Sequence, residues 1–331
     1  MAVSIEAKNL TKDFVITKKE PGLKGAFKSL IHSEKSILHA VNNISFSIET
    51  GQIVGYIGPN GAGKSTTIKM MSGILQPTSG EVTIGGLSPF KERKKVVRNL
   101  GVVFGQRTQL YWDLRLGESF ELLRRIYEID DDTYHKNLTV LNDILNIQEI
   151  INTPVRQLSL GQRMRGDLAA AILHSPPVIF LDEPTIGLDV DVKYCVRQFI
   201  KDINEQYHTT IILTTHDLGD IEKLCDRIII INHGEIIHDC SLETLMNNFA
   251  PDRQLVVDLY KEPENSVAIN NVKIIKQEGA RLWIEYNKKE TGTGDIIESI
   301  AAKYPIRDIS IEESKIEDVI RKIYAKGEIQ N

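Results

Sequence analysis

The chain has 331 residues, of which 41% are hydrophobic, and it carries a net charge of −5 at neutral pH. This length allows one large or two smaller domains, and this composition allows a buried core. The acidic balance excludes a general nucleic-acid-binding surface. The three cysteines form no CxxC pair, which argues against a disulfide framework or a zinc site and indicates a reducing cytoplasm.

The N-terminus lacks the charged and then apolar arrangement of a signal peptide. Nowhere do 18 consecutive apolar residues occur, so no segment is predicted to span a bilayer. We therefore expect any association with a membrane to be peripheral.

In residues 1–248, short apolar runs alternate with amphipathic stretches of helical length. Four runs are predicted to be buried strands of a mostly parallel sheet: Ile53–Ile57, Val178–Leu181, Thr210–Thr214 and Ile228–Ile231. Two stretches are predicted to be helices between them, Thr66–Met71 and Val192–Glu205. Between about residues 114 and 177 helical spacing replaces the strand signal, which predicts a helical insert. This alternation is typical of an α/β fold.

Residues 249–331 form a second block, which starts where the pattern resets beside a proline. Its predicted strands are Leu255–Leu259, Val272–Lys276, Arg281–Tyr286 and Arg307–Ile311, and its predicted helices are Asp295–Tyr304 and Ile316–Tyr324. This pattern predicts a small C-terminal α+β domain.

A glycine-rich segment separates the first predicted strand from the first predicted helix. It comprises Gly58, Pro59, Asn60, Gly61, Ala62, Gly63, Lys64, Ser65 and Thr66. The segment fits G-x-x-x-x-G-K-[ST], the phosphate-binding loop, in the strand–loop–helix context that this motif requires. Its glycines let backbone N–H groups wrap around phosphate oxygens at a helix N-terminus. Lys64 would add a positive charge, and the Ser65 hydroxyl can ligate Mg²⁺.

Two carboxylates, Asp182 and Glu183, follow the apolar run Val178–Leu181. Such a pair on its own is commonly a solvated strand end. The phosphate loop favours a catalytic interpretation, because ligands of open α/β sheets bind at the carboxyl ends of the strands. We expect Asp182 to help hold Mg²⁺ through water, and Glu183 to orient and deprotonate the attacking water.

With these motifs the sequence resembles the ABC ATPase family. The segment Leu158–Gln162 is similar to the LSGGQ signature, Gly187–Asp189 to the D-loop, and Thr214–Asp217 to the segment of the switch histidine. Gln106 stands where the family has its Q-loop glutamine, and Phe14 where an aromatic ring stacks on adenine. The motifs occur in the family's order and cover residues 9 to about 245.

The resemblance implies an ABC ATPase core in which an antiparallel β subdomain and a helical subdomain accompany the mostly parallel sheet. It implies ATP and Mg²⁺ as cofactors, with Ser65, Gln106 and Asp182 holding the metal, and His216 acting with Glu183 in catalysis. It further implies that Ser159, Gly161 and Gln162 act on the nucleotide of a partner subunit, and that Asp189 belongs to the D-loop. One departure is Leu160, which replaces the first glycine of the signature.

The function implied is that of an ATP-hydrolysing subunit that powers transport through a separate polytopic permease. It would work as a two-fold dimer, with a second copy or a paralogous subunit, at the cytoplasmic face of the cell membrane. Residues 107–113, which include Trp112, would contact the permease. The alternative is a non-transport ABC ATPase of the repair or translation type. The transport interpretation is favoured because Lys64 and Ser159 are only 95 positions apart, without heptads between them, and because one cassette is present.

The C-terminal block resembles the domain appended to exporter-type ATPases of the ABC-2 group, and it would serve packing or dimer stability, or act as a sensor. A polysaccharide or lipid-linked glycan exporter is an alternative within transport. Residues 15–38 form an insertion with five lysines against two glutamates and an apolar stripe at helical spacing. This insertion is either a surface helix packed on its own domain or a basic helix that meets the permease or anionic lipid.

Overall fold

The computed structural model describes residues 2–17, 35–105, 107–250, 252–263, 272–287, 290–313 and 315–329. The chain divides into two compact units, residues 1–240 and 241–331. Helix α9 (Leu242–Phe249) packs on α11 (Ile316–Ile329), so it groups with the C-terminal unit, and the boundary lies before α9 rather than after residue 248. Most of the insertion predicted at 15–38 lies outside the described residues.

The centre of the first unit is a six-stranded sheet with the order β5-β6-β7-β3-β8-β9. Its strands are β3 (Ile53–Ile57), β5 (Leu100–Phe104), β6 (Val178–Asp182), β7 (Thr210–Thr214), β8 (Arg227–Asn232) and β9 (Glu235–Ser241). All pairs from β5 to β8 are parallel, which explains the almost uninterrupted apolar runs of these buried strands. The four strands predicted in this unit are confirmed.

A second, antiparallel sheet has the order β2-β1-β4, with β1 (Val3–Thr17), β2 (Lys35–Glu49) and β4 (Ser79–Ile84). The helix α2 (Lys64–Met71) contacts strands of both sheets. One hydrophobic core joins Ile5 and Ile48 of the antiparallel sheet, Tyr56 of β3 and Met70 of α2. The start of α2 is therefore held between two sheets.

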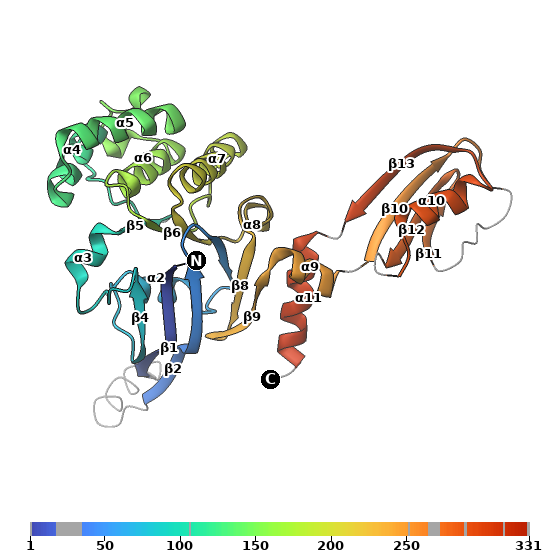
Figure 1. Ribbon diagram of the computed structural model, residues 1–331, viewed down its shortest axis with the longest axis horizontal. Coiled ribbons are helices and arrows are strands. Elements are labelled where there is room, and N and C mark those ends of the chain that lie inside the picture. The colour runs from blue at the N-terminus through green and yellow to red at the C-terminus, as the bar shows by residue number, and fades with distance from the viewer. Residues whose placement is uncertain are drawn as a thin grey trace, which may run out of the picture. The chain divides into compact units, whose positions relative to one another are not determined.

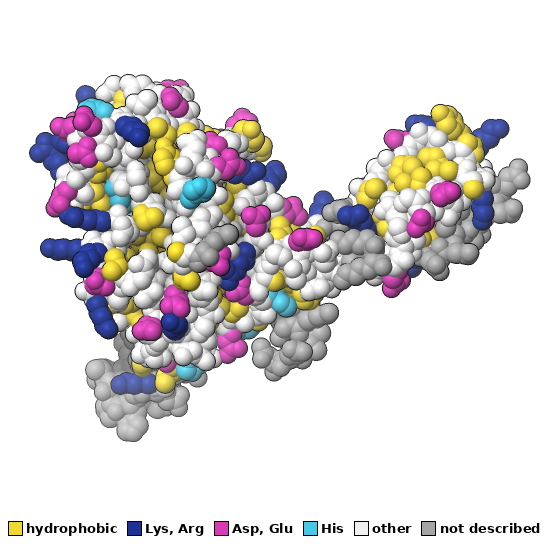
Figure 2. All heavy atoms as spheres, in the orientation of Figure 1, with side chains coloured by type: hydrophobic (Ala, Val, Ile, Leu, Met, Phe, Trp, Pro, Cys, Tyr) yellow, Lys and Arg dark blue, Asp and Glu magenta, His cyan; other side chains and the backbone are white. Residues whose placement is uncertain are grey.

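Helices gather at one end of the first unit (Figure 1). They are α4 (Leu116–Tyr127), α5 (Asp131–Leu145), the short turns η1 (Ile147–Glu149) and η2 (Val155–Gln157), and α6 (Leu160–Ile172). They lie within the insert predicted at 114–177. The remaining helices of this unit are α3 (Arg93–Arg98), α7 (Val190–Tyr207) and α8 (Leu218–Leu224). Acidic and basic side chains are intermixed over the helical end (Figure 2).

The C-terminal unit contains an antiparallel sheet of order β11-β12-β10-β13. Its elements are β10 (Asp252–Leu259), β11 (Lys273–Glu278), β12 (Arg281–Asn287), α10 (Thr293–Ala301) and β13 (Ile306–Glu313). Ile296 and Ile300 of α10 share a core with alternate strand residues such as Leu255 and Ile284, so α10 covers one face of the sheet. The predicted α+β elements are confirmed. In the described part of both units, no helix is long and apolar enough to cross a membrane.

Candidate functional site

The predicted site residues meet at the carboxyl edge of the parallel sheet. The phosphate loop follows β3, Asp182 and Glu183 lie at the end of β6, and His216 follows β7. Because β7 lies between β6 and β3, residues far apart in the sequence share one edge. This is where open α/β sheets bind ligands.

Two glycines of the phosphate loop are required by close approaches of the backbone. A Cβ at Gly58 would lie 2.3 Å from the carbonyl oxygen of Ile231, and one at Gly63 would lie 2.4 Å from that of Ala40. Gly63 also has a φ of 108°, which favours glycine. The loop is therefore wound tightly against β2 and β8, and it leads directly into α2.

Lys64 lies within this loop and is 6% exposed. Its Nζ donates hydrogen bonds to the carbonyl oxygens of Gly58, at 2.6 Å, and Pro59, at 3.1 Å. Burial lowers the pKa of the Lys64 ammonium, and the carboxylates of Glu183 and Asp182 oppose that shift. A phosphate in the loop would add a further negative charge to stabilise the ammonium.

Asp182 and Ser65 bring hard oxygen donors together. Oδ1 of Asp182 accepts hydrogen bonds from the Thr214 hydroxyl at 2.5 Å and the Ser65 hydroxyl at 3.4 Å. Among the described residues, no group of three or more His, Cys, Asp or Glu could hold a metal ion. Mg²⁺ nevertheless fits this pair, because it commonly takes one or two protein oxygens and completes its shell with water and phosphate.

Glu183 has a left-handed backbone, with a φ of 57°. Its N–H donates to the carbonyl oxygen of Thr214 at 2.9 Å, and its Oε1 lies 2.8 Å from Nε2 of His216. The ends of β6 and β7 are therefore joined through both backbone and side chains. Glu183 and His216 can act on the same small ligand.

Gly105 brings the end of β5 against the same carboxylates. Its N–H donates to the carbonyl oxygen of Asp182 at 2.7 Å. A Cβ on Gly105 would lie 2.1 Å from the carbonyl oxygen of Glu183, so only glycine permits this approach. The adjacent predicted residue, Gln106, lies outside the described residues.

A groove of about 490 Å³ runs along the phosphate loop. Its lining comprises Phe14, Leu38, His39, Ala40, Asn60, Gly61, Gly63, Lys64, Ser65, Thr66, Glu183 and His233. Phe14 thus lines the same groove as the phosphate loop, and Nζ of Lys12 lies 5.4 Å from its ring centroid. No motif contains Leu38, His39, Ala40 or His233, so sequence reasoning missed them, and only the folded sheets bring them to the groove.

The signature-like residues lie at the start of α6 and contribute nothing to the described lining of that groove. Oγ of Ser159 accepts from the N–H of Gln162 at 3.2 Å, and Oε1 of Gln162 accepts from the N–H of Ser159 at 2.9 Å. This reciprocal pair is a capping box. The box fixes the start of α6, where both Ser159 and Gln162 are engaged with their own backbone.

The D-loop residues lie beside the signature. Asp189 caps α7 by accepting from the N–H of Val192 at 2.9 Å. A Cβ on Gly161 would approach Cγ2 of Val192 to 2.9 Å, and one on Gly187 would approach Cδ2 of Leu160 to 3.2 Å. The side chain of Leu160, where the family usually has glycine, thus packs toward the D-loop.

Asp167 is a buried carboxyl group that the sequence did not indicate. Its Oδ1 accepts from the Thr108 hydroxyl at 2.8 Å and from the N–H of Gln109 at 3.0 Å. Burial raises the pKa of Asp167 to about 6, although these hydrogen bonds oppose the shift. Asp167 attaches the segment after Gln106 to the middle of α6.

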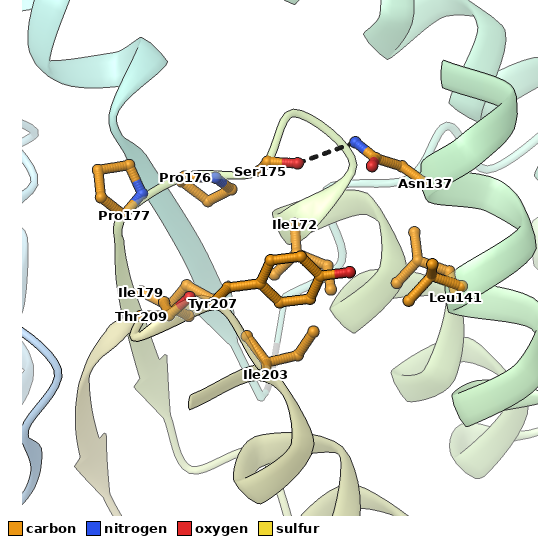
Figure 3. A pocket seen from close by; sticks show the side chains of 11 residues that line it. Asn137, Leu141, Ile172, Ser175, Pro176, Pro177, Ile179, Ile203, Tyr207 and Thr209 are labelled. Atoms are coloured by element: carbon orange, nitrogen blue, oxygen red, sulfur yellow. Dashed lines mark hydrogen bonds between the residues drawn. The ribbon is translucent and has the colours of Figure 1, made fainter. Parts of the chain in front are cut away.

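A separate apolar pocket of about 210 Å³ lies between α5, the end of α6 and α7 (Figure 3). Leu141, Ile172, Ile203 and the ring of Tyr207 line it. The pocket lies at the amino ends of β6 and β7, since Ile179 and Thr209 also line it. It is therefore at the opposite edge of the sheet from the phosphate loop and forms no part of that site.

Comparison with known proteins identifies a family that the chain matches. Residues 41–186 match the family described as ABC transporter. The ABC transporter ATP-binding protein NatA of Bacillus subtilis is 32% identical over 64% of this chain and 86% of NatA. The linearmycin resistance ATP-binding protein LnrL of the same organism is 36% identical over 60% of this chain and 63% of LnrL. The methionine import ATP-binding protein MetN 3 of Shouchella clausii is 28% identical over 92% of this chain and 90% of MetN 3.

Solved structures share the fold of the first unit. The ATP-binding cassette MJ0796, solved as a dimer in a post-hydrolysis state with ADP and Pi, has a TM-score of 0.60 and 28% identity. The match covers 72% of this chain and 98% of that cassette.

Proposed function

The chain belongs to the ABC transporter ATP-binding family and is therefore an ATPase subunit. We propose that the residues at this sheet edge bind and hydrolyse ATP, and that the hydrolysis powers transport through a permease. The observation that carries the proposal is the contact of 2.8 Å between Glu183 and His216 beside a phosphate loop that holds Lys64. These groups come from three different strands of one sheet edge.

In this proposal, residues 58–66 wrap the phosphates of ATP and Phe14 stacks on the base. Glu183 is the general base that orients and deprotonates the attacking water. His216, held against Glu183, contacts the γ-phosphate and stabilises its charge. Its position 2.8 Å from Glu183 lets one small site hold both water and phosphate.

Ser65 and Asp182 would hold Mg²⁺, Asp182 through water, and Gln106 is proposed as the third contributor. When bound, the metal neutralises charge on the phosphate oxygens. The hydrogen bond from Thr214 to Asp182 at 2.5 Å orients the carboxylate toward Ser65.

The working unit is proposed to be a two-fold dimer, with a second copy or a paralogous subunit. Ser159, Gly161 and Gln162 would act on the partner's ATP, with Asp189 beside them. Their absence from the described lining of the chain's own groove supports action in trans. The dimeric state of the related cassette MJ0796 supports the same arrangement.

Transport is proposed to occur through a polytopic permease, with this chain at the cytoplasmic face of the membrane. Residues 107–113 suit such a contact, because Tyr111 and Trp112 are exposed and Asp167 anchors this segment at Thr108 and Gln109. We propose an ABC-2-type exporter, which the name of LnrL supports. MetN 3, by contrast, is named as an import protein. Measuring whether the assembled transporter moves substrate out of or into the cell therefore tests the proposed direction.

The first test replaces Lys64 by alanine. Loss of its charge should weaken ATP binding by about 10- to 100-fold, as expected for hydrogen bonds to a charged group. Lys94→Ala, at an exposed position on α3, is the matched control. Titration with a fluorescent ATP analogue measures both variants, and normal affinity in Lys64→Ala would contradict the assignment of the phosphate loop.

A further inference from the structure

A buried carboxylate accepts hydrogen bonds from two residues that lie close in the chain to Glu183 and His216. Asp220 of α8 is 0% exposed. Its Oδ1 accepts from Nε of Arg197 at 2.5 Å, and its Oδ2 accepts from the hydroxyls of Thr185 at 2.6 Å and Thr215 at 3.1 Å. A buried carboxylate with three donors is held firmly, because every donor it lost would leave charge unsatisfied in a medium of low dielectric constant.

The two threonines come from the two segments that carry the proposed catalytic pair. Thr185 is two residues after Glu183, and Thr215 immediately precedes His216. Both threonines are buried. A single carboxylate oxygen therefore ties the segment after β6, which carries Glu183, to the segment after β7, which carries His216.

Helix α7 holds the same region from a third side. Arg197 binds Asp220, and its second guanidinium nitrogen lies 3.5 Å from Oδ2 of Asp217. Lys193, one turn earlier on α7, donates to the same oxygen of Asp217 at 2.7 Å. Asp189 of the D-loop is the N-cap of α7. Asp217, the residue that follows His216, is therefore bonded to the helix that the D-loop caps.

We propose that Asp220 is a positioning residue for ATP hydrolysis. It sets the separation of Glu183 and His216 through Thr185 and Thr215, and Arg197 links this geometry to the D-loop helix. Small displacements of a catalytic group lower rates steeply, by up to about 100-fold per ångström. The nucleotide is bound mainly by the phosphate loop, so loss of this positioning should lower kcat and leave ATP affinity unchanged. The inference rests on the roles proposed for Glu183 and His216.

The leading test is Thr185→Val, which removes one donor and keeps the size of the side chain. We expect kcat to fall by about tenfold and ATP affinity to stay within about twofold. Thr185→Ser restores the hydroxyl and should restore kcat. Thr215→Val and Thr215→Ser repeat the comparison from the other segment. Thr210→Val is the matched control for a lost threonine hydroxyl, because buried Thr210 accepts the N–H of Gly51 at the opposite end of β7 from His216.

A second measurement separates positioning from general stability. In a chain that already carries His216→Ala, adding Thr185→Val should lower the single-turnover rate of phosphate release by less than about twofold. The reason is that Thr185 acts through the placement of Glu183 against His216, which is already lost in that background. If the effects of His216→Ala and Thr185→Val on the rate were fully additive, the inference would be overturned. Unchanged kcat in both valine variants, or failure of both serine variants to restore kcat, would overturn it as well. Normal turnover in Glu183→Gln would instead refute the proposed function. Normal turnover in the valine variants beside an inactive Glu183→Gln would refute this inference alone.

Discussion

At the scale of single residues, the conformation of Glu183 is the most unusual local feature of the site. A glutamate with a φ of 57° adopts a backbone that costs of order 1–3 kcal/mol outside glycine. Its N–H donates to the backbone oxygen of Thr214 at 2.9 Å, which offsets part of this cost. The result is that the carboxylate leaves the strand end next to His216.

Replacement of Glu183 by glutamine tests the general base. The amide has the same shape and cannot take a proton, so turnover should fall by about 10²–10⁴-fold while ATP binding persists. Removal of a negative charge near the γ-phosphate should also trap the chain as an ATP-bound dimer. Phosphate release and the mass of the protein in ATP, measured together, check both effects. Glu205→Gln, an exposed position on α7, is the control, and near-normal turnover in Glu183→Gln would rule out its assignment.

At the scale of elements, helix α6 joins two regions of the proposed machinery. Its first turn carries the signature, and Asp167 in its middle holds Thr108 and Gln109. Gly161 packs closely on Val192 of α7. A movement of this rigid helix would therefore reach the D-loop helix and the segment proposed to meet the permease.

Ser159→Ala distinguishes a cap from a functional group. Ser159 and Ser241 both cap helices by accepting an N–H, at 3.2 Å and 3.1 Å. Each alanine variant should lower the free energy of unfolding by about 1 kcal/mol. Only Ser159→Ala should lower ATPase activity, since only that hydroxyl is proposed to meet a partner's nucleotide. Thermal unfolding and phosphate release provide the comparison, and equal activity of the two variants would count against action in trans.

The buried carboxyl of Asp167 predicts a dependence of stability on pH. Its folded-state pKa of about 6 is above the value near 3.9 of an unfolded aspartate. The folded state therefore binds the proton more tightly, and the stability that this group contributes at low pH is lost as the pH rises from about 4 to 6. The side chain of the Asp167→Asn variant stays neutral. As the pH rises over that interval, the free energy of unfolding of this variant should therefore increase by about 1–3 kcal/mol relative to that of the native chain. Urea unfolding at several pH values measures this difference, and a constant difference would contradict it.

At the scale of the whole molecule, every described residue of the proposed ATP site lies in the unit 1–240. The C-terminal unit has a separate core in which Leu255, Ile284 and Ile296 are buried. We therefore propose that this unit contributes to dimer stability or coupling and not to the chemistry.

Truncation after Cys240 tests this division. The shortened chain should fold and bind ATP with unchanged affinity, because the groove and phosphate loop are complete within it. Dimer formation or permease-stimulated turnover should be weaker than in the full chain. Circular dichroism, nucleotide titration and the mass of the dimer are the measurements. A folded fragment that fails to bind ATP would show that the units share the site.

Much of the fold follows from the sequence alone. Ile53–Ile57 and Thr210–Thr214 were predicted to the residue, because buried parallel strands are continuous apolar runs bounded by polar or glycine residues. The phosphate loop and the carboxylates after β6 could also be predicted. The residues of each motif are consecutive or nearly so, and a short segment of chain between a strand and a helix is enough to form it. Local patterns of this kind depend only on neighbours in the sequence.

Only the tertiary structure decided the remainder. Asp220 lies 35 residues from Thr185 along the chain, yet its carboxylate accepts the Thr185 hydrogen bond, and no motif signals that contact. His39 and His233 reach the groove from a strand and a turn that carry no nucleotide motif. Helix α9 belongs to the C-terminal unit because it packs on α11, which is distant in sequence. Such contacts depend on which strands and helices lie next to one another in space. The hydrophobic periodicity of one segment contains no information about which segment packs against it.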